Sequence, residues 1–408
     1  MKKGFLILIF LAGILSPVLA KHITGGEMIY DYLGPGASVG TKRYSITLRL
    51  FRDDNCISCA GMPANVSIAI FDNNSNANIS GFVNVGLSFT EILPINTLPP
   101  CITNPPLLEY TVGYYTFEVE LADNNDGYTA AYQTCCRIDG IQNIPDQVGA
   151  TYITTIPGKN VLGILLNDNS PRFSKGISVV CYNKPFTLDF SATDPDGDLL
   201  IYKLCDAYDG GGARNAGYTT PAGPPYNSVS YTNSYSGLSP LGPLASINSS
   251  TGIISGIAPD AGNYVVSVCV ESYKGGKYIA THRKDFIITV AACDLPGAKL
   301  VTPYYINCDS YLVNFTNLVE SPLNLTFDWD FGDPASGTNN FSTAGSAAHN
   351  FSDTGVFLIK LIVNKGSSCA DSATAPVRIF PGYFPAFKQN SPTCKNVPVQ
   401  FNDLTTAS

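Results

Sequence analysis

The sequence has few of the residues on which catalysis and membrane insertion usually depend. Its 408 residues include three His, three Met and one Trp. We find no His-Glu-x-x-His metal motif, no Gly-x-Ser-x-Gly nucleophile motif and no phosphate-binding Gly loop before a helix. Beyond the N-terminus, no apolar run reaches the roughly 20 residues that a transmembrane helix needs. We therefore expect neither an enzyme nor a membrane-spanning chain.

Charged residues are also scarce, at 14% of the chain, and acidic residues outnumber basic ones by 32 to 24. Binding to nucleic acid requires clustered basic residues that neutralise phosphates, and the sequence contains no basic stripe. We therefore expect no nucleic-acid partner. Gly and Pro are abundant instead, with 37 and 28 copies, which favours short elements separated by turns.

The N-terminus, "MKKGFLILIFLAGILSPVLA", has the pattern of a secretory signal peptide. Lys2 and Lys3 precede an apolar run, and Val18 and Ala20 satisfy the small-residue rule for cleavage. We predict cleavage after Ala20, which removes two Lys and takes the net charge from −8 to −10. The protein is then secreted or lies at the cell surface. There its twelve Cys are expected to form disulfides rather than thiols or zinc sites.

Short runs of alternating apolar and polar residues recur along the chain, for example "YSITLRLF", "YYTFEVEL" and "FLIKLIV". Runs of this length that are rich in β-branched and aromatic residues, and bounded by Gly, Pro, Asn or Asp, are typical of β-sandwiches. No long stretch shows helical periodicity. We predict an all-β protein, and its length indicates about three domains.

Two Cys-led segments align without gaps, which indicates an internal repeat. The segment "CDSYLVNFTNL", which begins at Cys308, matches "CKNVPVQFNDL", which begins at Cys394. One strand cannot bury its apolar face alone. We therefore expect residues 383–408 to hold the first strand of a further repeat that continues beyond Ser408. The alternative is a short native tail whose likeness is accidental.

Residues 293–382 contain "FDWDFGD", followed by "HNFSDTGVF". This region resembles the PKD domain family, which has a Trp-Asp-Phe-Gly-Asp core and a later aromatic-x-x-x-Gly-x-aromatic strand entry. The resemblance implies an immunoglobulin-like β-sandwich here and a PKD-like repeat at residues 383–408. The matching residues are Trp329, Asp330, Phe331, Gly332, Asp333, His349, Phe351, Gly355 and Phe357.

Strand alternation places Trp329 and Phe331 in the core of this unit, with Asp330 facing solvent or the Gly332-Asp333 turn. The alternatives for these acids are a catalytic pair or a weak calcium site, and no nucleophile or free His base lies nearby in the sequence. Cys308 and Cys369 are the Cys inside this unit, and we predict that they form a disulfide.

Residues 169–292 resemble the cadherin-like, or dystroglycan-type, immunoglobulin domains of bacterial surface proteins. In "DPDGD", three Asp at alternate positions offer hard oxygen ligands, so one hypothesis is a calcium site on Asp194, Asp196 and Asp198. The other hypothesis is a tight turn, in which Pro195 and Gly197 set the backbone. The residues that carry the resemblance are Asp194, Asp196, Gly197, Asp198, Thr251, Gly252, Ile254, Gly256, Gly262 and Tyr264.

This second region also holds a long insert, "DAYDGGGARNAGYTTPAGPPYNSVSYTNSYSGLSPLG", which is rich in Tyr, Gly, Ser and Pro. Long loops in compact domains are often functional, and this composition suits a contact surface. A disordered segment without a binding role is the alternative.

Residues 21–168 resemble the N-terminal module that precedes PKD repeats in large surface proteins of Bacteroidetes, for which the resemblance implies no established activity. Neighbouring Cys rarely bond to each other, so we expect Cys135 and Cys136 to bond to other Cys, with Cys101 as one partner. The motif "CISC" follows a strand-like run rather than opening a helix, which does not favour redox activity. The residues that carry the resemblance are Gly25, Gly26, Glu27, Arg52, Asp53, Cys135, Cys136, Arg137, Asn143 and Ile144.

Two functions compete for this set of domains. The first is a disulfide-linked stalk or adhesin of tandem immunoglobulin-like sandwiches, whose loops bind extracellular polysaccharide or a cell-surface protein. The PKD resemblance adds export by the type IX secretion machinery and a role in adhesion or gliding. The second is a set of accessory spacer or substrate-binding domains of a larger secreted hydrolase. The sequence beyond Ser408 distinguishes them, through either a sorting domain or a catalytic domain.

Overall fold

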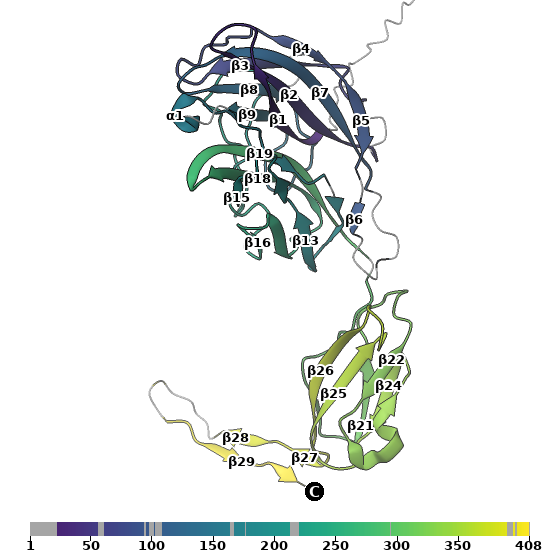
Figure 1. Ribbon diagram of the computed structural model, residues 1–408. Coiled ribbons are helices and arrows are strands. Elements are labelled where there is room, and N and C mark those ends of the chain that lie inside the picture. Colours follow the sequence, from purple (N-terminus) through teal and green to yellow (C-terminus); the bar gives the residue numbers. More distant parts are fainter. Residues whose placement is uncertain are drawn as a thin grey trace, which may run out of the picture. The chain divides into compact units, whose positions relative to one another are not determined.

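The computed structural model describes residues 23–55, 61–93, 95–97, 102, 108–163, 167–175, 177–212, 220–293, 295–389, 395 and 398–407 (Figure 1). These residues form strands almost throughout, so the predicted all-β fold is confirmed. Among them, no helix is long and apolar enough to cross a membrane. The expected signal peptide and cleavage site, and Cys56, Cys59, Cys101 and Cys394, lie outside the described residues.

The chain divides into two compact units. The first comprises Met1–Leu98 and Pro106–Ala292, and the second comprises Pro99–Pro105 and Cys293–Ser408. A division after residue 292 therefore coincides with the expected start of the PKD-like region. The regions expected at 21–168 and 169–292 belong instead to a single unit, so residue 168 does not separate two compact units.

One eight-stranded sheet unites the first unit, in the order β15-β18-β19-β1-β2-β7-β5 with β12 added on β19. Strands β1 and β19 join its two halves in antiparallel register, with Glu27 opposite Lys284 (Figure 1). Gly25 is required at this seam, because a Cβ there would lie 2.2 Å from the carbonyl oxygen of Asp285. The strands are β1 (Ile23–Pro35), β2 (Thr41–Asp53), β5 (Phe89–Ile92), β7 (Tyr110–Ala122), β12 (Val180–Cys181), β15 (Leu199–Cys205), β18 (Gly262–Lys274) and β19 (Lys277–Ala291).

Each half of the long sheet belongs to its own sandwich. The four-stranded sheet β4-β3-β8-β9 shares a core with β1, β2 and β7 that includes Tyr30, Leu48 and Tyr115. The three-stranded sheet β13-β17-β16 shares another with β15, β18 and β19 that includes Phe190, Tyr264 and Phe286. The strands are β3 (Asn65–Asp72), β4 (Val83–Gly86), β8 (Tyr128–Thr134), β9 (Ala150–Ile156), β13 (Pro185–Asp189), β16 (Ala245–Ile247) and β17 (Ile253–Ile257).

Shorter elements complete the first unit. Strand β10 (Arg172–Phe173) pairs with β14 (Ala192–Thr193), and β6 (Ile95–Thr97) pairs in parallel with β11 (Ile177–Ser178). The single α-helix of the described residues, α1, covers only Lys159–Leu162. Leu162 from this turn packs on Ile279 and Ala280 of β19.

The second unit contains a sandwich in which sheet β20-β26-β25-β22-β23 faces the pair β21-β24. Its core holds Phe315, Trp329, Phe331 and Phe351, and both Trp329 and Phe331 are almost fully buried, as the alternation predicts. The elements are β20 (Tyr305–Asn307), β21 (Leu312–Thr316), β22 (Phe327–Asp330), the 3-10 helix η1 (Pro334–Asn340), β23 (Phe341–Ser342), β24 (Ser346–Asn350), β25 (Gly355–Val363) and β26 (Asp371–Ile379).

Residues after this sandwich form two short antiparallel pairs, β27 (Tyr383–Phe384) with β30 (Thr406–Ala407) and β28 (Phe387–Gln389) with β29 (Phe401–Asp403). Phe401 is exposed and packs edge-on against Phe387. In the sequence repeat Phe401 corresponds to Phe315, which is buried in the preceding sandwich. The expectation that residues 383–408 begin a further repeat remains a prediction.

The predicted disulfide between Cys308 and Cys369 is wrong. Cys308 is a free thiol, whereas Cys369 is disulfide-bonded and therefore has another partner. Strand β20 runs parallel to β26 with Asn307 opposite Ile379, so Cys308 lies beside the end of β26, while Cys369 precedes its start. At about 3.3 Å per strand residue this places them roughly 30 Å apart, far beyond disulfide reach.

The vicinal Cys also differ from the expectation. Cys135 and Cys136 are bonded to each other, because adjacent residues bring two sulfur atoms together without any long-range contact. A second disulfide joins Cys205 at the end of β15 to Cys269 on β18, the neighbouring strand. Cys181 and Cys293 are disulfide-bonded as well. This use of Cys fits an oxidising compartment.

Candidate functional site

The "DPDGD" segment forms a turn that bonds to Asn169, whose side-chain oxygen accepts the backbone N–H of Tyr32 on β1. One oxygen of Asp194 accepts the backbone N–H groups of Asp196 and Asp198, at 2.8 and 3.2 Å. The carboxylate of Asp196 accepts the backbone N–H and the side-chain amide of Asn169, at 2.7 and 3.0 Å. Asp198 lies 3.6 Å from the ammonium group of Lys274.

These contacts favour the turn hypothesis over the calcium hypothesis for Asp194, Asp196 and Asp198. Among the described residues, no group of three or more His, Cys, Asp or Glu side chains is arranged to hold a metal ion. One carboxylate oxygen of Asp194 and one of Asp198 are nevertheless buried without a hydrogen-bond partner. The turn therefore concentrates negative charge in a site that water reaches poorly.

Asp168, which the sequence did not single out, lies close to this turn. The hydroxyl of Tyr30 donates a hydrogen bond to its carboxylate. Burial, followed by the negative charges of Asp196, Asp198 and Asp194, raises the pKa of Asp168 to about 7, although the Tyr30 hydrogen bond opposes the shift. Nothing in the local sequence "LNDNSP" reveals a buried Asp, because the burial comes from β1, far away in the chain.

Charged residues are buried where the halves of the first unit meet. Arg49 bonds to Glu27 at 2.8 Å, and Arg137 bonds to Asp285 at 2.5 Å. One oxygen each of Glu27 and Asp285, and two guanidinium nitrogens of Arg137, have no hydrogen-bond partner. Such a pair favours one register of the strands, because in any other register its charges would be buried without their partners.

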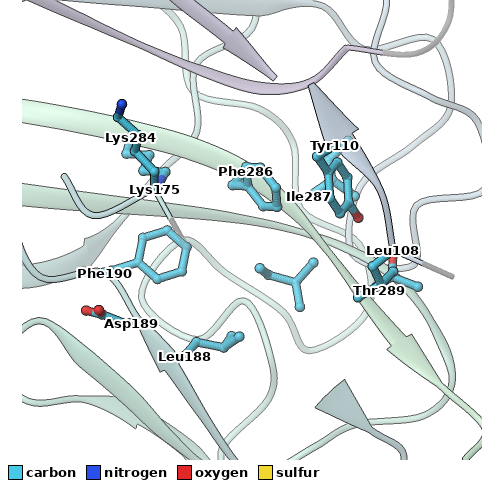
Figure 2. A pocket seen from close by; sticks show the side chains of 11 residues that line it. Leu108, Tyr110, Lys175, Leu188, Asp189, Phe190, Lys284, Phe286, Ile287 and Thr289 are labelled. Atoms are coloured by element: carbon cyan, nitrogen blue, oxygen red, sulfur yellow. The ribbon is translucent and has the colours of Figure 1, made fainter. Parts of the chain in front are cut away.

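A pocket lies beside this junction, between β13, β19 and the segment that leads into β7 (Figure 2). Its walls include Leu188, Phe190, Phe286 and Tyr110, with Lys284 at one end. The ammonium group of Lys284 donates to the carbonyl of Ser174 at 2.6 Å. That group also lies 5.1 to 5.9 Å from the ring centres of Phe51, Phe190 and Phe286.

Burial lowers the pKa of Lys284 to about 8, although nearby Glu27 opposes the shift. A lysine with such a pKa could act as a nucleophile only if a substrate reached it. Here the ammonium is enclosed by aromatic rings and a backbone carbonyl, which stabilise the charged form. We therefore assign Lys284 a structural role in the junction.

The described part of the long insert packs against both sandwiches, although many of its residues are exposed. Tyr226 packs with Phe71 and Ala131 of the first sandwich, and Ala222 donates its N–H to Gln133. Elsewhere in the insert, the ring of Tyr208 lies 3.9 Å from the guanidinium of Arg283 on β19. The insert thus crosses from one sandwich to the other, and its tyrosines are largely used in packing.

One end of the second sandwich nevertheless carries an open groove, which three loops form together. Tyr182 and Asn183 come from the turn after β12, Tyr235 comes from the insert, and Asp260 comes from the turn after β17. Tyr235 is fixed against Tyr264, with ring centres 5.7 Å apart. The groove encloses about 730 Å³ of space, open solvent included.

The PKD-like motif of the second unit forms a buried polar corner. The Asp333 carboxylate bonds to Nε2 of His349 at 2.9 Å and accepts both the N–H and the hydroxyl of Ser352. Burial raises its pKa, but the hydrogen bonds from Ser352 and His349 outweigh burial and leave the pKa below its usual value. Both Ser352 and His349 point at the acid, so this is not the serine–histidine–acid relay of a hydrolase.

The remaining motif residues set the backbone of the same corner. One oxygen of Asp330 accepts the N–H of Gly332, at 2.9 Å, and the amide of Asn340, at 3.0 Å. Gly332 has a φ of +70°, and a Cβ there would lie 2.4 Å from the carbonyl oxygen of Leu358. Gly355 opens β25 at a φ of +151°. The motif residues therefore determine the backbone conformation of this corner.

Comparison with known proteins adds little to these observations. No protein-family model matches the chain, and no curated protein matches it either. Similar solved structures include the four N-terminal immunoglobulin domains of Dscam1 isoform 6.44, at 10% identity over 87% of this chain and 91% of that chain, with a TM-score of 0.18. The human desmocollin-1 ectodomain has 12% identity over 87% and 72%, with a TM-score of 0.21.

Proposed function

We propose that this protein is a non-enzymatic extracellular binding scaffold, a stalk or adhesin built from immunoglobulin-like sandwiches. The observation that carries the proposal is the eight-stranded sheet shared by two sandwiches, which joins them into the first compact unit rather than leaving two separate domains. Its disulfides fit an oxidising, extracellular compartment. A rigid body with loops at its ends is suited to presenting a binding surface.

We further propose that the second unit is a PKD domain and that the protein belongs to the PKD-containing surface proteins of Bacteroidetes. The polar corner supports the first part, because it gives Asp333 and His349, two of the motif residues, a structural role. A secretory signal, type IX export and a role in adhesion or gliding follow from this proposal, and a cell-surface protein or polysaccharide is the expected partner.

The second candidate is a set of accessory domains in a larger secreted hydrolase. The open groove favours it equally, since such domains also bind substrate. The two differ in the domains that would accompany this one in the same polypeptide. A domain that degrades the bound ligand would support the hydrolase, whereas further repeats and a sorting domain would support the adhesin.

The test is attachment under flow. Microspheres coupled to residues 21–408 are passed over cellulose, chitin and bacterial cell layers, with microspheres carrying heat-unfolded protein as the control. We expect the folded protein to retain microspheres on at least one surface and to release no soluble sugar. Equal retention by folded and unfolded protein would refute a binding role, and sugar release would refute the absence of enzymatic activity.

A further inference from the structure

We propose that the groove formed by Tyr182, Asn183, Tyr235 and Asp260 binds an oligosaccharide without negative charge. This inference rests on the proposed binding function and names the site and the ligand class. The groove lies entirely within the first unit, at one end of the second sandwich.

Hydrogen bonds hold the turns that form the groove, and an exposed tyrosine lines one side of it. The hydroxyl of Tyr264 donates to the carbonyl of Asp260 at 2.9 Å, and the N–H of Asn183 donates to the carbonyl of Ala258 at 3.2 Å. These bonds hold the turn after β12 against the turn after β17. Tyr182 is 47% exposed, although its backbone N–H is bonded to the carbonyl of Ala291.

The polar side chains around the groove offer both acceptors and donors. The carboxylate of Asp260 accepts hydrogen bonds, whereas the amide of Asn183 and the hydroxyl of Tyr182 can donate as well as accept. The hydroxyl groups of a sugar also donate and accept, so they match this mixture. Pro243 and Pro259 have no backbone N–H, so at these positions the lining offers no main-chain donor to a peptide.

The charge and the shape of the groove also favour an uncharged sugar chain. Asp260 is the charged residue that lines the groove, so an anionic ligand would be repelled. Exposed apolar surface beside it, including Leu244 and the ring of Tyr182, suits the apolar face of a pyranose ring. The opening is a groove rather than a closed cavity, which admits a chain longer than the site.

The experiment is titration calorimetry of residues 21–408 with four neutral hexasaccharides: cellohexaose, chitohexaose, maltohexaose and mannohexaose. We expect at least one to bind with a Kd of about 1 mM or tighter. Tyr182→Ala should weaken that binding about tenfold, and Tyr182→Phe should change it less than about twofold, because the ring remains. Tyr304→Ala is the matched control, since Tyr304 is an exposed tyrosine of the second unit.

Three results would overturn the inference. Binding of none of the four sugars would refute the ligand class, and a Tyr182→Ala variant that binds normally would refute the site. Equal losses in Tyr182→Ala and Tyr304→Ala would show that the effect is not local. Microspheres that attach to cells while no sugar binds would leave the adhesin function standing and assign its ligand to a protein instead.

Discussion

The two units stabilise their β-sandwich cores with different kinds of buried groups. The first unit buries charge at its centre, with the pair Arg137–Asp285 across its two halves and the pair Glu27–Arg49 on β1 and β2 beside their junction. The sandwich of the second unit has an aromatic core around Trp329 and one polar corner at Asp333. Apolar packing stabilises many arrangements of similar volume. Buried pairs penalise every wrong arrangement, and the first unit has to join strands from distant parts of the chain.

The largest expected effect is the removal of one buried partner in the first unit. Arg137→Ala leaves Asp285 charged and unpaired, which should cost about 3–5 kcal/mol of unfolding free energy. Urea unfolding followed by far-UV circular dichroism would show the earlier transition. Fluorescence of Trp329, which is the only Trp and lies in the second unit, should keep its midpoint.

The control for that variant is an exposed pair. Lys203→Ala removes the ion pair with Glu271 on neighbouring strands of the same sheet, and it should cost no more than about 1 kcal/mol. If Arg137→Ala and Lys203→Ala have the same effect, burial of the junction charge does not matter. If the Trp329 midpoint moves as well, the two units do not unfold independently.

The second effect is a pH dependence confined to the first unit. The unfolded chain loses the proton of Asp168 near its ordinary pKa of 3.8, whereas the folded unit keeps it up to about 7. The folded state therefore binds more protons between these values, and stability falls as pH rises from about 4 to 7. The loss attributable to Asp168 is at most about 4 kcal/mol.

Asp168→Asn cannot ionise and should lose this dependence. We expect the wild type to be relatively more stable near pH 4 and relatively less stable near pH 7, measured as the difference between the two proteins in urea. His282, which burial gives a pKa of about 3, acts in the opposite direction in both proteins and cancels in that difference. A difference that does not vary with pH would show that Asp168 is ionised in the folded protein.

The third expected effect is a loss of stability confined to the second unit. Leu361 is fully buried on β25 opposite Trp329 on β22, and Leu361→Ala should cost about 3 kcal/mol through the lost transfer energy and the cavity. The Trp329 fluorescence transition should shift to lower urea, while the first unit keeps its transition. Leu358→Ala, at an exposed position of the same strand, is the control and should change little.

The smallest effect concerns calcium. Because Asp194, Asp196 and Asp198 already bond within the turn or to Asn169 and Lys274, we expect millimolar calcium to move the melting midpoint of the first unit by less than about 1 °C relative to chelator. A larger rise that disappears in Asp196→Asn would restore the calcium hypothesis. Asp353→Asn, an exposed Asp of the second unit, provides the matched control.

The sequence predicts the second unit better than the first for a physical reason. Trp329, Phe331 and Gly332 lie in one short stretch, and local alternation and turn chemistry determine where they point. The junction of the first unit depends on β1 and β19, whose pairing joins Gly25 to Phe286. Neither strand carries a local signal for its partner. The same is true of Asp168, whose burial depends on Tyr30, and of Cys308, whose neighbour on β26 is set by strand register.

The role of the long insert also could not be predicted from its sequence. Its composition indicates a surface, and Tyr235 does reach an open groove. Tyr208 and Tyr226 instead pack against residues supplied by other strands. Composition alone could not separate the two groups, because both occur in similar polar sequence.

The position of β1 has a consequence for how the chain acquires its structure. This strand comes first in the described chain, yet it lies between β2 and β19, and β19 ends at Ala291. A chain that emerges N-terminus first can pair β1 with β2 at once, but the other edge of β1 stays open until β19 has followed. Contacts of such long sequence separation form slowly. During that interval the unpaired edge is exposed to other chains, so newly emerged protein should depend on a chaperone or on rapid completion of the first unit.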